Sequence, residues 1–214
     1  MQEKMIEESS EKCCTVVCDK PLDKDYWNAQ YSSNNTKWDL NEVSPAIRQY
    51  IDQIQDSNIK ILIPGCGNAH EAHYLLQKGF KNIHLIDIAP VLVNNLKEKY
   101  KNNHYIEIIE GDFFEHQESY DLILEQTFFC AIAPTMRQAY ADKVYELLKP
   151  HGKLVGVLFD KEFEFDGPPF GGCKCKYVNY FEGRFDFKVF EKCSLSHPKR
   201  KDEELFIILQ KIAP

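Results

Sequence analysis

The sequence has little of what membrane-spanning or nucleic-acid-binding proteins require. Its uninterrupted apolar runs, such as residues 206–209, are far shorter than the roughly 18 residues that a transmembrane helix needs. It has no basic block, and 26 Lys and Arg residues against 33 Asp and Glu residues give a formal net charge of −7. We therefore expect neither a membrane partner nor nonspecific binding to nucleic acid.

The chain also lacks a secretory signal and the cysteine spacing of a structural zinc site. Residues 1–12 contain four glutamates and no apolar core. Eight cysteines are present, but they form no paired C-x-x-C motif. We expect reduced thiols in a cytoplasmic protein and no metal site, although Cys173 and Cys175 could form a ligand pair.

No internal repeat or low-complexity tract divides the chain. Its 214 residues are enough to bury a full hydrophobic core without disulfides or metals. Residues 1–20 show no periodicity, and we expect them to form a mobile N-terminal arm. Residues 21–214 are expected to form a single domain.

From residue 59 onward, short apolar runs alternate with helical patterns. The runs at residues 60–64, 83–88, 104–110, 120–125 and 153–159 are rich in Ile, Leu and Val, which is typical of strands buried on both faces. Gly79 follows the first helical pattern and Pro90 opens the second. The alternation predicts an α/β fold, a Rossmann-like doubly wound sheet with helices on both faces.

Two further strand-like runs, at residues 185–193 and 203–210, follow each other directly in the sequence. A polar turn near His197 separates them, so they predict a C-terminal antiparallel hairpin. One hairpin strand inserted antiparallel beside parallel strands is the topology of many methyltransferases, an analogy at the level of the fold.

The first predicted strand leads directly into a turn that contains two glycines, at residues 64–69. Glycines at the carboxyl end of a first parallel strand let a ligand approach the backbone, and the following helix offers free N–H groups. Gly65 and Gly67 begin the dinucleotide pattern G-x-G-x-x-G, but its third glycine would fall on His70. A pyrophosphate-binding loop is therefore disfavoured, and a purely structural turn is the alternative.

Acidic residues follow the next two predicted strands. Asp87 closes the second strand, where a carboxylate can accept hydrogen bonds from both hydroxyls of a ribose; a helix cap before Pro90 is the alternative. Asp112 and Phe113 follow the third strand, where an acid can accept from an adenine amino group and a ring can lie against the base. Together the three strand ends fit S-adenosylmethionine better than NAD.

Several stretches of the chain resemble the thiopurine S-methyltransferase family, including its thiol and halide methyltransferase branches. They are IPGCGNAHEAHYL, LIDIAP, GDFF, EQTFFCAIAP, YADKVYELLKP and DGPPFG, within a similarity that spans about residues 26–211. EQTFFCAI and GPPF are much narrower patterns than a glycine loop. The resemblance implies a class I S-adenosylmethionine-dependent methyltransferase with a seven-stranded sheet.

The resemblance also implies roles for single residues in cofactor binding. Gly65 would contact the methionine part, with Gly67 in the same loop. Asp87 would contact the ribose, and Asp112 and Phe113 the adenine.

An N-terminal segment that carries Trp27, Tyr31 and Trp38 would fold over the cofactor, according to the same resemblance. An aromatic cluster without a ligand is the alternative. Gln126, or its backbone, would lie beside the cofactor. In the thiopurine-specific branch an arginine stands at the Gln126 position, so bulky aromatic thiols are less expected here.

Two further positions depart from the family pattern. Where the family has the sequence W-D-L-G, this chain has W-D-L-N, with Asn41 in the last place. Ala69 stands where the family has a loop glycine, two places after Gly67. Neither departure removes a chemically necessary group.

For the methyl acceptor, we predict contacts with five residues near the cofactor site: Trp38, Phe128, Phe129, Pro168 and Phe170. Phe128 and Phe129 follow the fourth predicted strand, where a substrate would arrive, but they would serve equally well in a hydrophobic core. Asp166 and the loop at residues 167–170 would shape the mouth of the site.

No catalytic residue is predicted, because a sulfonium methyl group is already activated and its transfer depends mainly on positioning. Cys130 as a nucleophile is disfavoured for the same reason. The sequence therefore predicts methyl transfer from S-adenosylmethionine to a small soft nucleophile: a thiol, hydrosulfide, thiocyanate, halide or chalcogen anion. An NAD-dependent oxidoreductase and a noncatalytic cofactor-binding module are the alternatives. A monomer is plausible, although the sequence leaves the oligomeric state open.

Overall fold

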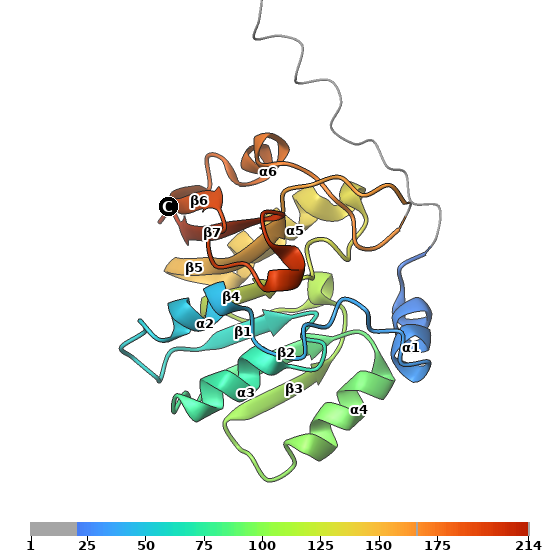
Figure 1. Ribbon diagram of the computed structural model, residues 1–214. Helices are drawn as coiled ribbons and strands as arrows, with labels where there is room; N and C mark the ends of the chain where they lie inside the picture. Colours follow the sequence, from blue (N-terminus) through green and yellow to red (C-terminus); the bar gives the residue numbers. More distant parts are fainter. Residues whose placement is uncertain (1–20, 166, 214) are drawn as a thin grey trace, which may run out of the picture.

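The computed structural model describes residues 21–165 and 167–213, which form a seven-stranded sheet with helices on both faces (Figure 1). The strand order is β3-β2-β1-β4-β5-β7-β6. All neighbouring strands pair in parallel except β7, which is antiparallel to both β5 and β6. The predicted α/β class and the C-terminal hairpin are confirmed. The predicted arm, residues 1–20, lies outside the described residues.

The strands are β1 (Ile61–Pro64), β2 (Ile83–Asp87), β3 (Ile106–Glu110), β4 (Tyr120–Gln126), β5 (Leu148–Phe159), β6 (Phe185–Lys192) and β7 (Glu204–Lys211). The α-helices are α1 (Lys24–Ser32), α2 (Pro45–Ile51), α3 (His70–Gln77), α4 (Pro90–Lys99), α5 (Arg137–Leu147) and α6 (Lys174–Phe181). Short 3-10 helices are η1 (Phe113–Glu115), η2 (Pro134–Met136) and η3 (Pro198–Arg200).

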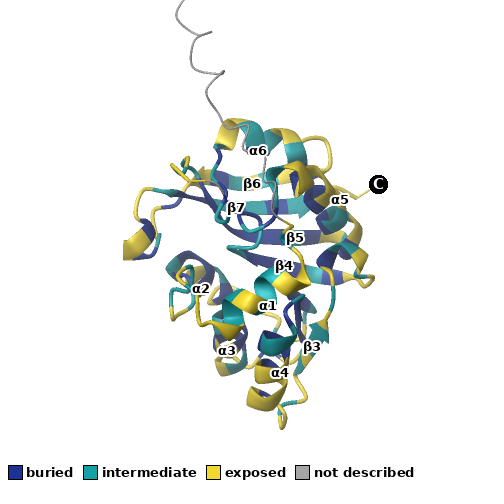
Figure 2. Ribbon diagram, turned by 90° about the vertical axis from the view of Figure 1, so that its right-hand side faces the viewer, coloured by how far each residue is buried: buried dark blue, intermediate teal, exposed yellow. Residues whose placement is uncertain are grey.

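Two hydrophobic clusters hold the helices to the two faces of the sheet. One cluster joins the sheet to α2, α3 and α4 through residues such as Ile47, Leu75 and Leu92. The other joins it to α5 and α6 through residues such as Tyr140 and Phe181. The central strands are buried throughout (Figure 2), which explains their nearly continuous apolar sequences.

Helix α1 belongs to neither layer. It packs against α4 and lies beside the carboxyl ends of the central strands (Figure 1). The side-chain Oδ1 of Asn28 in α1 accepts a hydrogen bond from the backbone N–H of Val91, 2.9 Å away, in the first turn of α4. Because the first N–H groups of a helix have no partner inside it, this contact fixes α1 at the strand ends.

The structure differs from the sequence prediction at the start of β5. The sequence suggested that a helix ends at residues 149–152 and that a strand begins at residue 153, whereas β5 begins at Leu148, directly after α5. The pairing with β4 shifts register between Tyr120 and Leu122, so residues 149–152 bulge out of the ladder. Pro150, which has no N–H to donate, lies in this bulge.

A close approach of β4 and β5 requires glycine at position 156. Gly156 is paired with Glu125, and a Cβ atom there would lie 2.1 Å from the Glu125 carbonyl oxygen. Gly111 offers a matched control, because its Cβ would meet its nearest atom at 3.9 Å.

We expect Gly156→Ala to lower the free energy of unfolding by about 2–4 kcal/mol, because the two central strands must separate to admit the methyl group. Gly111→Ala is expected to change it by less than about 1 kcal/mol. Urea unfolding measures both. Equal effects of the two substitutions would contradict this account of the β4–β5 contact.

Candidate cofactor and acceptor site

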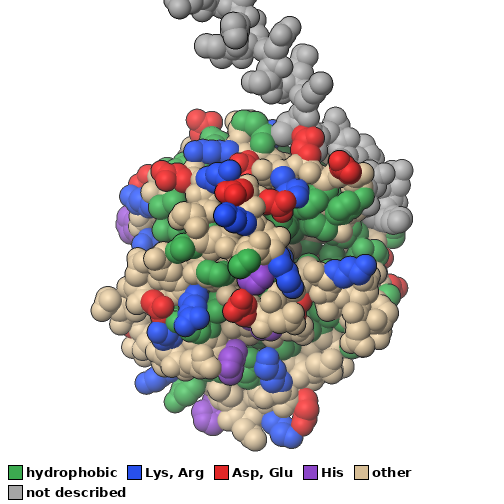
Figure 3. All heavy atoms as spheres, viewed as in Figure 1, with side chains coloured by type: hydrophobic (Ala, Val, Ile, Leu, Met, Phe, Trp, Pro, Cys, Tyr) green, Lys and Arg blue, Asp and Glu red, His purple; other side chains and the backbone are tan. Residues whose placement is uncertain are grey.

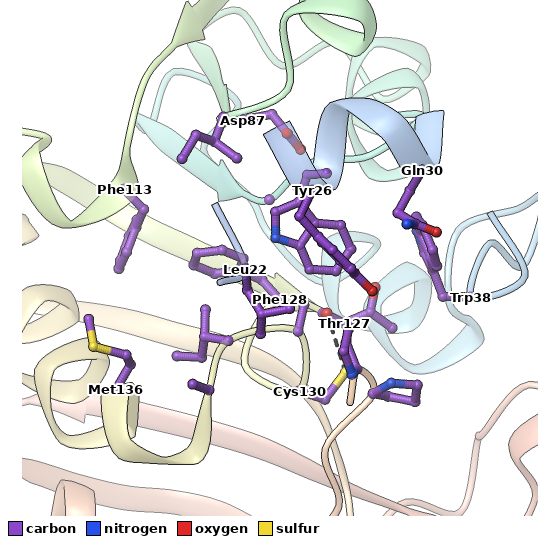
Figure 4. Close-up of a pocket in the computed structure, with 18 of the residues that line it drawn as sticks. Leu22, Tyr26, Gln30, Trp38, Asp87, Phe113, Thr127, Phe128, Cys130 and Met136 are labelled. Atoms are coloured by element: carbon purple, nitrogen blue, oxygen red, sulfur yellow. Dashed lines mark hydrogen bonds between the residues drawn. The ribbon is translucent and has the colours of Figure 1, made fainter. Parts of the chain in front are cut away.

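A cavity of about 900 Å³ lies at the carboxyl ends of the parallel strands. In Figure 4, Asp87, Phe113, Phe128 and Trp38 surround the same space although they come from four different segments of the chain. The lining residues fall within the ranges 22–40, 65, 86–88, 111–114, 127–136, 159–169 and 199–203.

The turn after β1 forms one wall of the cavity. Gly65 has a φ of 53°, and a Cβ atom at this position would lie 2.4 Å from the ring of Phe128. Only glycine therefore permits both the backbone conformation and the close approach of the ring. Gly67 does not line the cavity, but its N–H lies 3.5 Å from Oδ2 of Asp87 and donates a hydrogen bond to it.

Asp87 closes β2 with a carboxylate that is 8% exposed. Oδ1 of Asp87 accepts a hydrogen bond from the N–H of Ala89 at 3.0 Å. Burial raises the pKa of Asp87 to about 6, and the backbone hydrogen bonds only partly oppose this. The site thus holds a desolvated acid that accepts backbone hydrogen bonds from Gly67 and Ala89.

Three aromatic residues of the N-terminal segment form an interlocked roof. Trp38 makes edge-to-face contacts with Trp27 and with Tyr31, with ring centroids 5.7 and 5.8 Å apart. All three line the cavity. Burial, with a further contribution from Asp87, raises the pKa of Tyr31, so this hydroxyl group is neutral at physiological pH.

Asp39 fastens this roof to the start of α3. Oδ1 of Asp39 lies 2.8 Å from Nε2 of His70 and 2.6 Å from the N–H of Asn41, and Oδ2 accepts from the side chain of Asn68. Burial alone would raise the pKa of Asp39, but these hydrogen bonds outweigh it and lower the pKa to about 2. The same contact raises the pKa of His70.

The two departures from the family's glycine pattern have a common conformation. Asn41 has a φ of 61° and Ala69 a φ of 57°, both in the left-handed region that glycine adopts most easily. Asn tolerates this region better than other residues, whereas alanine adopts it at some cost in strain. Both positions thus keep the backbone conformation that the family's glycines favour.

The turn after β4 is organised by a buried glutamate. Oε1 of Glu125, which is 0% exposed, accepts hydrogen bonds from the N–H groups of Phe128 and Phe129, and Oε2 accepts from the hydroxyl of Tyr140 at 2.6 Å. Burial raises the pKa of Glu125 to about 7. The turn directs Phe128 into the cavity lining and leaves Phe129, which is 1% exposed, in the core.

Family comparison places this geometry among known enzymes. The chain matches the family model described as thiopurine S-methyltransferase (TPMT) over residues 22–213. The chain belongs to the thiopurine S-methyltransferase family. The predictions of this family, of an S-adenosylmethionine-dependent methyltransferase and of its cofactor are confirmed.

Two relatives and one solved structure illustrate the range of the family and of its fold. The chain is 30% identical over 149 residues to "Probable thiol methyltransferase 2" of Arabidopsis thaliana, covering 67% of this chain and about two thirds, 66%, of that protein. It is 27% identical over 190 residues to a thiopurine S-methyltransferase of Vibrio cholerae, covering 81% and 87%. The Burkholderia thailandensis 1,6-didemethyltoxoflavin-N1-methyltransferase, solved with S-adenosylhomocysteine, shares the fold at 14% identity, with a TM-score of 0.67 and coverage of 96% and 98%.

Most residues that the sequence assigned to the cofactor come together in the cavity of this family member. Seven of them line it: Trp27, Tyr31, Trp38, Gly65, Asp87, Asp112 and Phe113. Gly67 and Gln126 lie in the adjoining turns without lining it. The side-chain amide of Gln126 is enclosed and has no hydrogen-bond partner among the described residues. Their contacts to the cofactor stay predictions.

The residues predicted for the acceptor divide into two groups. Trp38, Phe128 and Pro168 line the cavity, whereas Phe129 and Phe170 do not. Both of these are buried, and Arg137 of α5 contacts each of them. Its guanidinium lies 4.8 Å from the centre of the Phe129 ring, and Nη2 donates to the Phe170 carbonyl oxygen at 3.0 Å. Asp166 lies outside the described residues.

Sequence reasoning missed several residues that line the cavity. Tyr26, Met136, Phe163 and Phe165 contribute apolar surface, and Arg200 contributes a buried cation. Only Arg200 could have been found from sequence, as a basic residue in the turn between two predicted strands, and that signal is weak.

Among the described cysteines and possible metal ligands, Cys130 alone lines the cavity. Burial raises the pKa of the Cys130 thiol to about 12, which makes it a poor nucleophile. Cys173 and Cys175 form a disulfide, with Cα atoms 5.4 Å apart, contrary to the expected reduced thiols. Cys13, Cys14 and Cys18 lie outside the described residues.

The described residues contain one group of three possible metal ligands, His84, Glu107 and Glu118. It lies near the amino ends of β2, β3 and β4, opposite the cavity, and Lys60 already pairs with Glu118. None of the described helices is long and apolar enough to cross a membrane.

We expect the ionised form of Asp87 to lower the free energy of unfolding, and we expect cofactor binding to offset this loss. Its folded pKa of about 6 exceeds the ordinary aspartate value of 3.8, so ionisation destabilises the fold increasingly from about pH 4 to pH 6 and fully above pH 6. We expect Asp87→Asn to raise the free energy of unfolding at about pH 7.5 by about 1–3 kcal/mol, and by much less near pH 4.5. Urea unfolding at both pH values measures this.

The same substitution should weaken binding of S-adenosylhomocysteine by about 1–3 kcal/mol in calorimetry. Asp112→Asn, at an exposed carboxylate one strand away, is the control for unfolding. If Asp87→Asn raised the free energy of unfolding without weakening the binding of S-adenosylhomocysteine, Asp87 would have no role in cofactor binding. An equal gain at both pH values would contradict the buried-charge explanation.

Proposed function

We propose that this member of the family transfers the methyl group of S-adenosylmethionine to a small soft nucleophile such as a thiol, hydrosulfide, thiocyanate, halide or chalcogen anion. The supporting observation is a single cavity with two unlike ends. A buried carboxylate, Asp87, stands at the β2 end, and an aromatic pocket around Trp38, Phe128 and Phe159 lies toward β5. The first end suits a nucleoside and the second a small polarisable acceptor.

The residues at the β2 end fit the cofactor. The buried Asp87 carboxylate would accept hydrogen bonds from the ribose hydroxyls, and the ring of Phe113 would lie against the adenine. Gly65, which lines the cavity, would contact the methionine part. When bound, S-adenosylmethionine supplies a methyl group activated by a sulfonium.

The chain itself contributes positioning and exclusion of water. The roof of Trp27, Tyr31 and Trp38 is fastened by Asp39 on one side, and Nη2 of Arg200 donates to the Trp38 carbonyl oxygen at 2.6 Å on the other. A closed roof lowers the local dielectric, which strengthens the attraction between a bound cation and an anionic nucleophile. We propose no general base, because Cys130 is protonated and Glu125 is occupied by three hydrogen bonds.

We further propose a cytoplasmic protein that acts as a monomer on small molecules, without nucleic-acid or membrane partners. Supporting this, Figure 3 shows basic and acidic side chains interspersed over the face in view. The buried thiols of Cys66, Cys130 and Cys193 are free and suit a reducing compartment, to which the Cys173–Cys175 disulfide is an exception.

The alternative of an NAD-dependent oxidoreductase has little support. His70 stands where the third glycine of the dinucleotide loop is needed, and its ring is held by Asp39. Only an activity assay distinguishes an enzyme from a noncatalytic module that binds the cofactor.

The assay uses S-adenosylmethionine with a tritiated methyl group and a panel of hydrosulfide, thiocyanate, iodide, 2-mercaptoethanol and thiophenol. We expect transfer to the small acceptors and little to bulkier aromatic thiols. Calorimetry with S-adenosylhomocysteine accompanies it. Binding no tighter than millimolar would refute the cofactor site, and tight binding without transfer to any acceptor would favour the noncatalytic module.

Asp39→Asn should loosen the roof without unfolding the protein. Because it removes the charge that holds His70, we expect donor affinity and turnover to fall by about tenfold. The effect should be largest below the raised pKa of His70 and should shrink as the pH rises through it. Calorimetry and initial rates across this pH range measure both quantities.

Asp56→Asn, in the exposed loop before β1, is the matched control. If Asp39→Asn instead lowered thermal stability strongly while leaving donor affinity intact, the aromatic segment would be a structural cluster and not a roof.

A further inference from the structure

Arg200 is a buried cation at the acceptor end of the cavity. It closes η3, in the connection between β6 and β7, and is 7% exposed. Its guanidinium lies 5.1 Å from the centre of the Phe159 ring, and both residues line the cavity. Burying an arginine costs free energy unless its charge and its N–H groups find partners, so its place in a ligand cavity calls for one.

The protein satisfies this arginine only in part. Nη2 donates to the Trp38 carbonyl oxygen at 2.6 Å, and Nη1 donates to Oε1 of Glu204 at 3.4 Å. Two of the five N–H donors of the guanidinium thus have acceptors among the described residues.

Glu204 compensates the charge of Arg200 weakly. Its contact is long, its Oε2 has no hydrogen-bond partner among the described residues, and it is 2% exposed. Burial raises the pKa of Glu204, and the nearby charge of Arg200 opposes this shift.

The cavity lining carries acids at the β2 and β3 ends, and on the Arg200 side it carries Glu203, which pairs with Lys161. The acids Asp87 and Asp112 follow β2 and β3, on one side of β1 and β4. Arg200 lies at the other side, next to β5 and β7. Among the described Lys and Arg residues that line the cavity, Arg200 is buried, whereas Lys37 and Lys199 are exposed.

We propose that Arg200 is the specificity-determining residue for the acceptor: it binds the negative charge of an anionic nucleophile and gives such acceptors preference over neutral ones. This proposal rests on the proposed methyl transfer and narrows its acceptor to anions. Through the Trp38 carbonyl, the same guanidinium also connects the acceptor's charge to the roof.

The chemistry of transfer agrees with an anionic acceptor. Attack by a lone pair of the anion forms a bond to the methyl carbon, the carbon–sulfur bond of the donor breaks, and its electron pair stays on the departing sulfur. A cation and an anion thereby give two neutral products. No proton has to be removed, which is consistent with a site in which we assign no base.

The physical preference follows from desolvation. A guanidinium on an aromatic ring in a dry cavity attracts an anion far more strongly than water would allow. Soft anions such as thiocyanate and iodide lose their hydration at low cost, and a neutral sulfide would leave the spare N–H donors of Arg200 unpaired.

The experiment compares Arg200→Gln and Arg200→Lys with the wild-type protein on an anionic acceptor, thiocyanate, and a neutral one, dimethyl selenide. For Arg200→Gln we expect the KM for thiocyanate to rise by about tenfold or more, with kcat changed by less than about threefold. The KM for dimethyl selenide should stay within about twofold. Arg200→Lys, which keeps the charge, should partly restore the KM for thiocyanate.

Lys201→Gln, next in sequence and exposed, is the control for a general loss of positive charge and should behave as wild type. A second readout does not depend on turnover. Thiocyanate is titrated by calorimetry into the protein saturated with S-adenosylhomocysteine, and Arg200→Gln should weaken its binding by about tenfold.

The outcomes separate this inference from the proposed function. Equal losses for both acceptors, or unchanged thiocyanate binding, would overturn the role of Arg200 and reduce it to support of the roof. If the wild-type protein methylates nothing, the proposed function fails. The thiocyanate titration still decides whether Arg200 forms an anion site.

Discussion

The cavity exists because the N-terminal segment is held across the carboxyl ends of the sheet, and the Asp39–His70 contact is the interaction on which this depends. Two short helices and an exposed loop cannot stay in place through propensity alone. Asp39 ties the loop to the start of α3, and Asn28 ties α1 to the start of α4. Both contacts use the N-terminal ends of helices that follow β1 and β2. The roof is therefore attached to the same two strand ends that carry Gly65 and Asp87.

The site gathers charges that the fold alone does not require. Burial raises the pKa of Asp87 to about 6 and that of Glu125 to about 7, while Arg200 stays only partly paired. Each is a cost to the free energy of folding. Glu125 offsets its cost by organising the turn after β4. Asp87 keeps a raised pKa despite its backbone hydrogen bonds, and Arg200 keeps N–H donors without acceptors among the described residues; we attribute both features to ligand binding. The family assignment is independent of this reasoning and agrees with it.

Much of the fold and part of the site could be predicted from sequence, because they follow from local patterns. Buried parallel strands give continuous apolar runs, and Gly65 and Asp87 stand at strand ends that topology must bring together. Contacts between distant segments could not be predicted. His70 stood out in the sequence only because it replaces the third glycine of the dinucleotide pattern, whereas its ring binds Asp39, 31 residues earlier. Phe129 and Phe170 were expected beside the acceptor, but both are buried in contact with Arg137 and do not line the cavity. Helix α6 was not predicted.

The central claim is that one nucleoside spans the ends of β1, β2 and β3 beneath the aromatic roof, with its sulfur directed toward the pocket that contains Arg200. A crystal structure of the protein with S-adenosylhomocysteine tests it most directly. The account predicts ribose hydroxyls on Asp87, adenine against Phe113, and the sulfur facing the space between Trp38 and Phe128. A nucleoside bound elsewhere, or in this cavity with its sulfur turned away from that space, would contradict it.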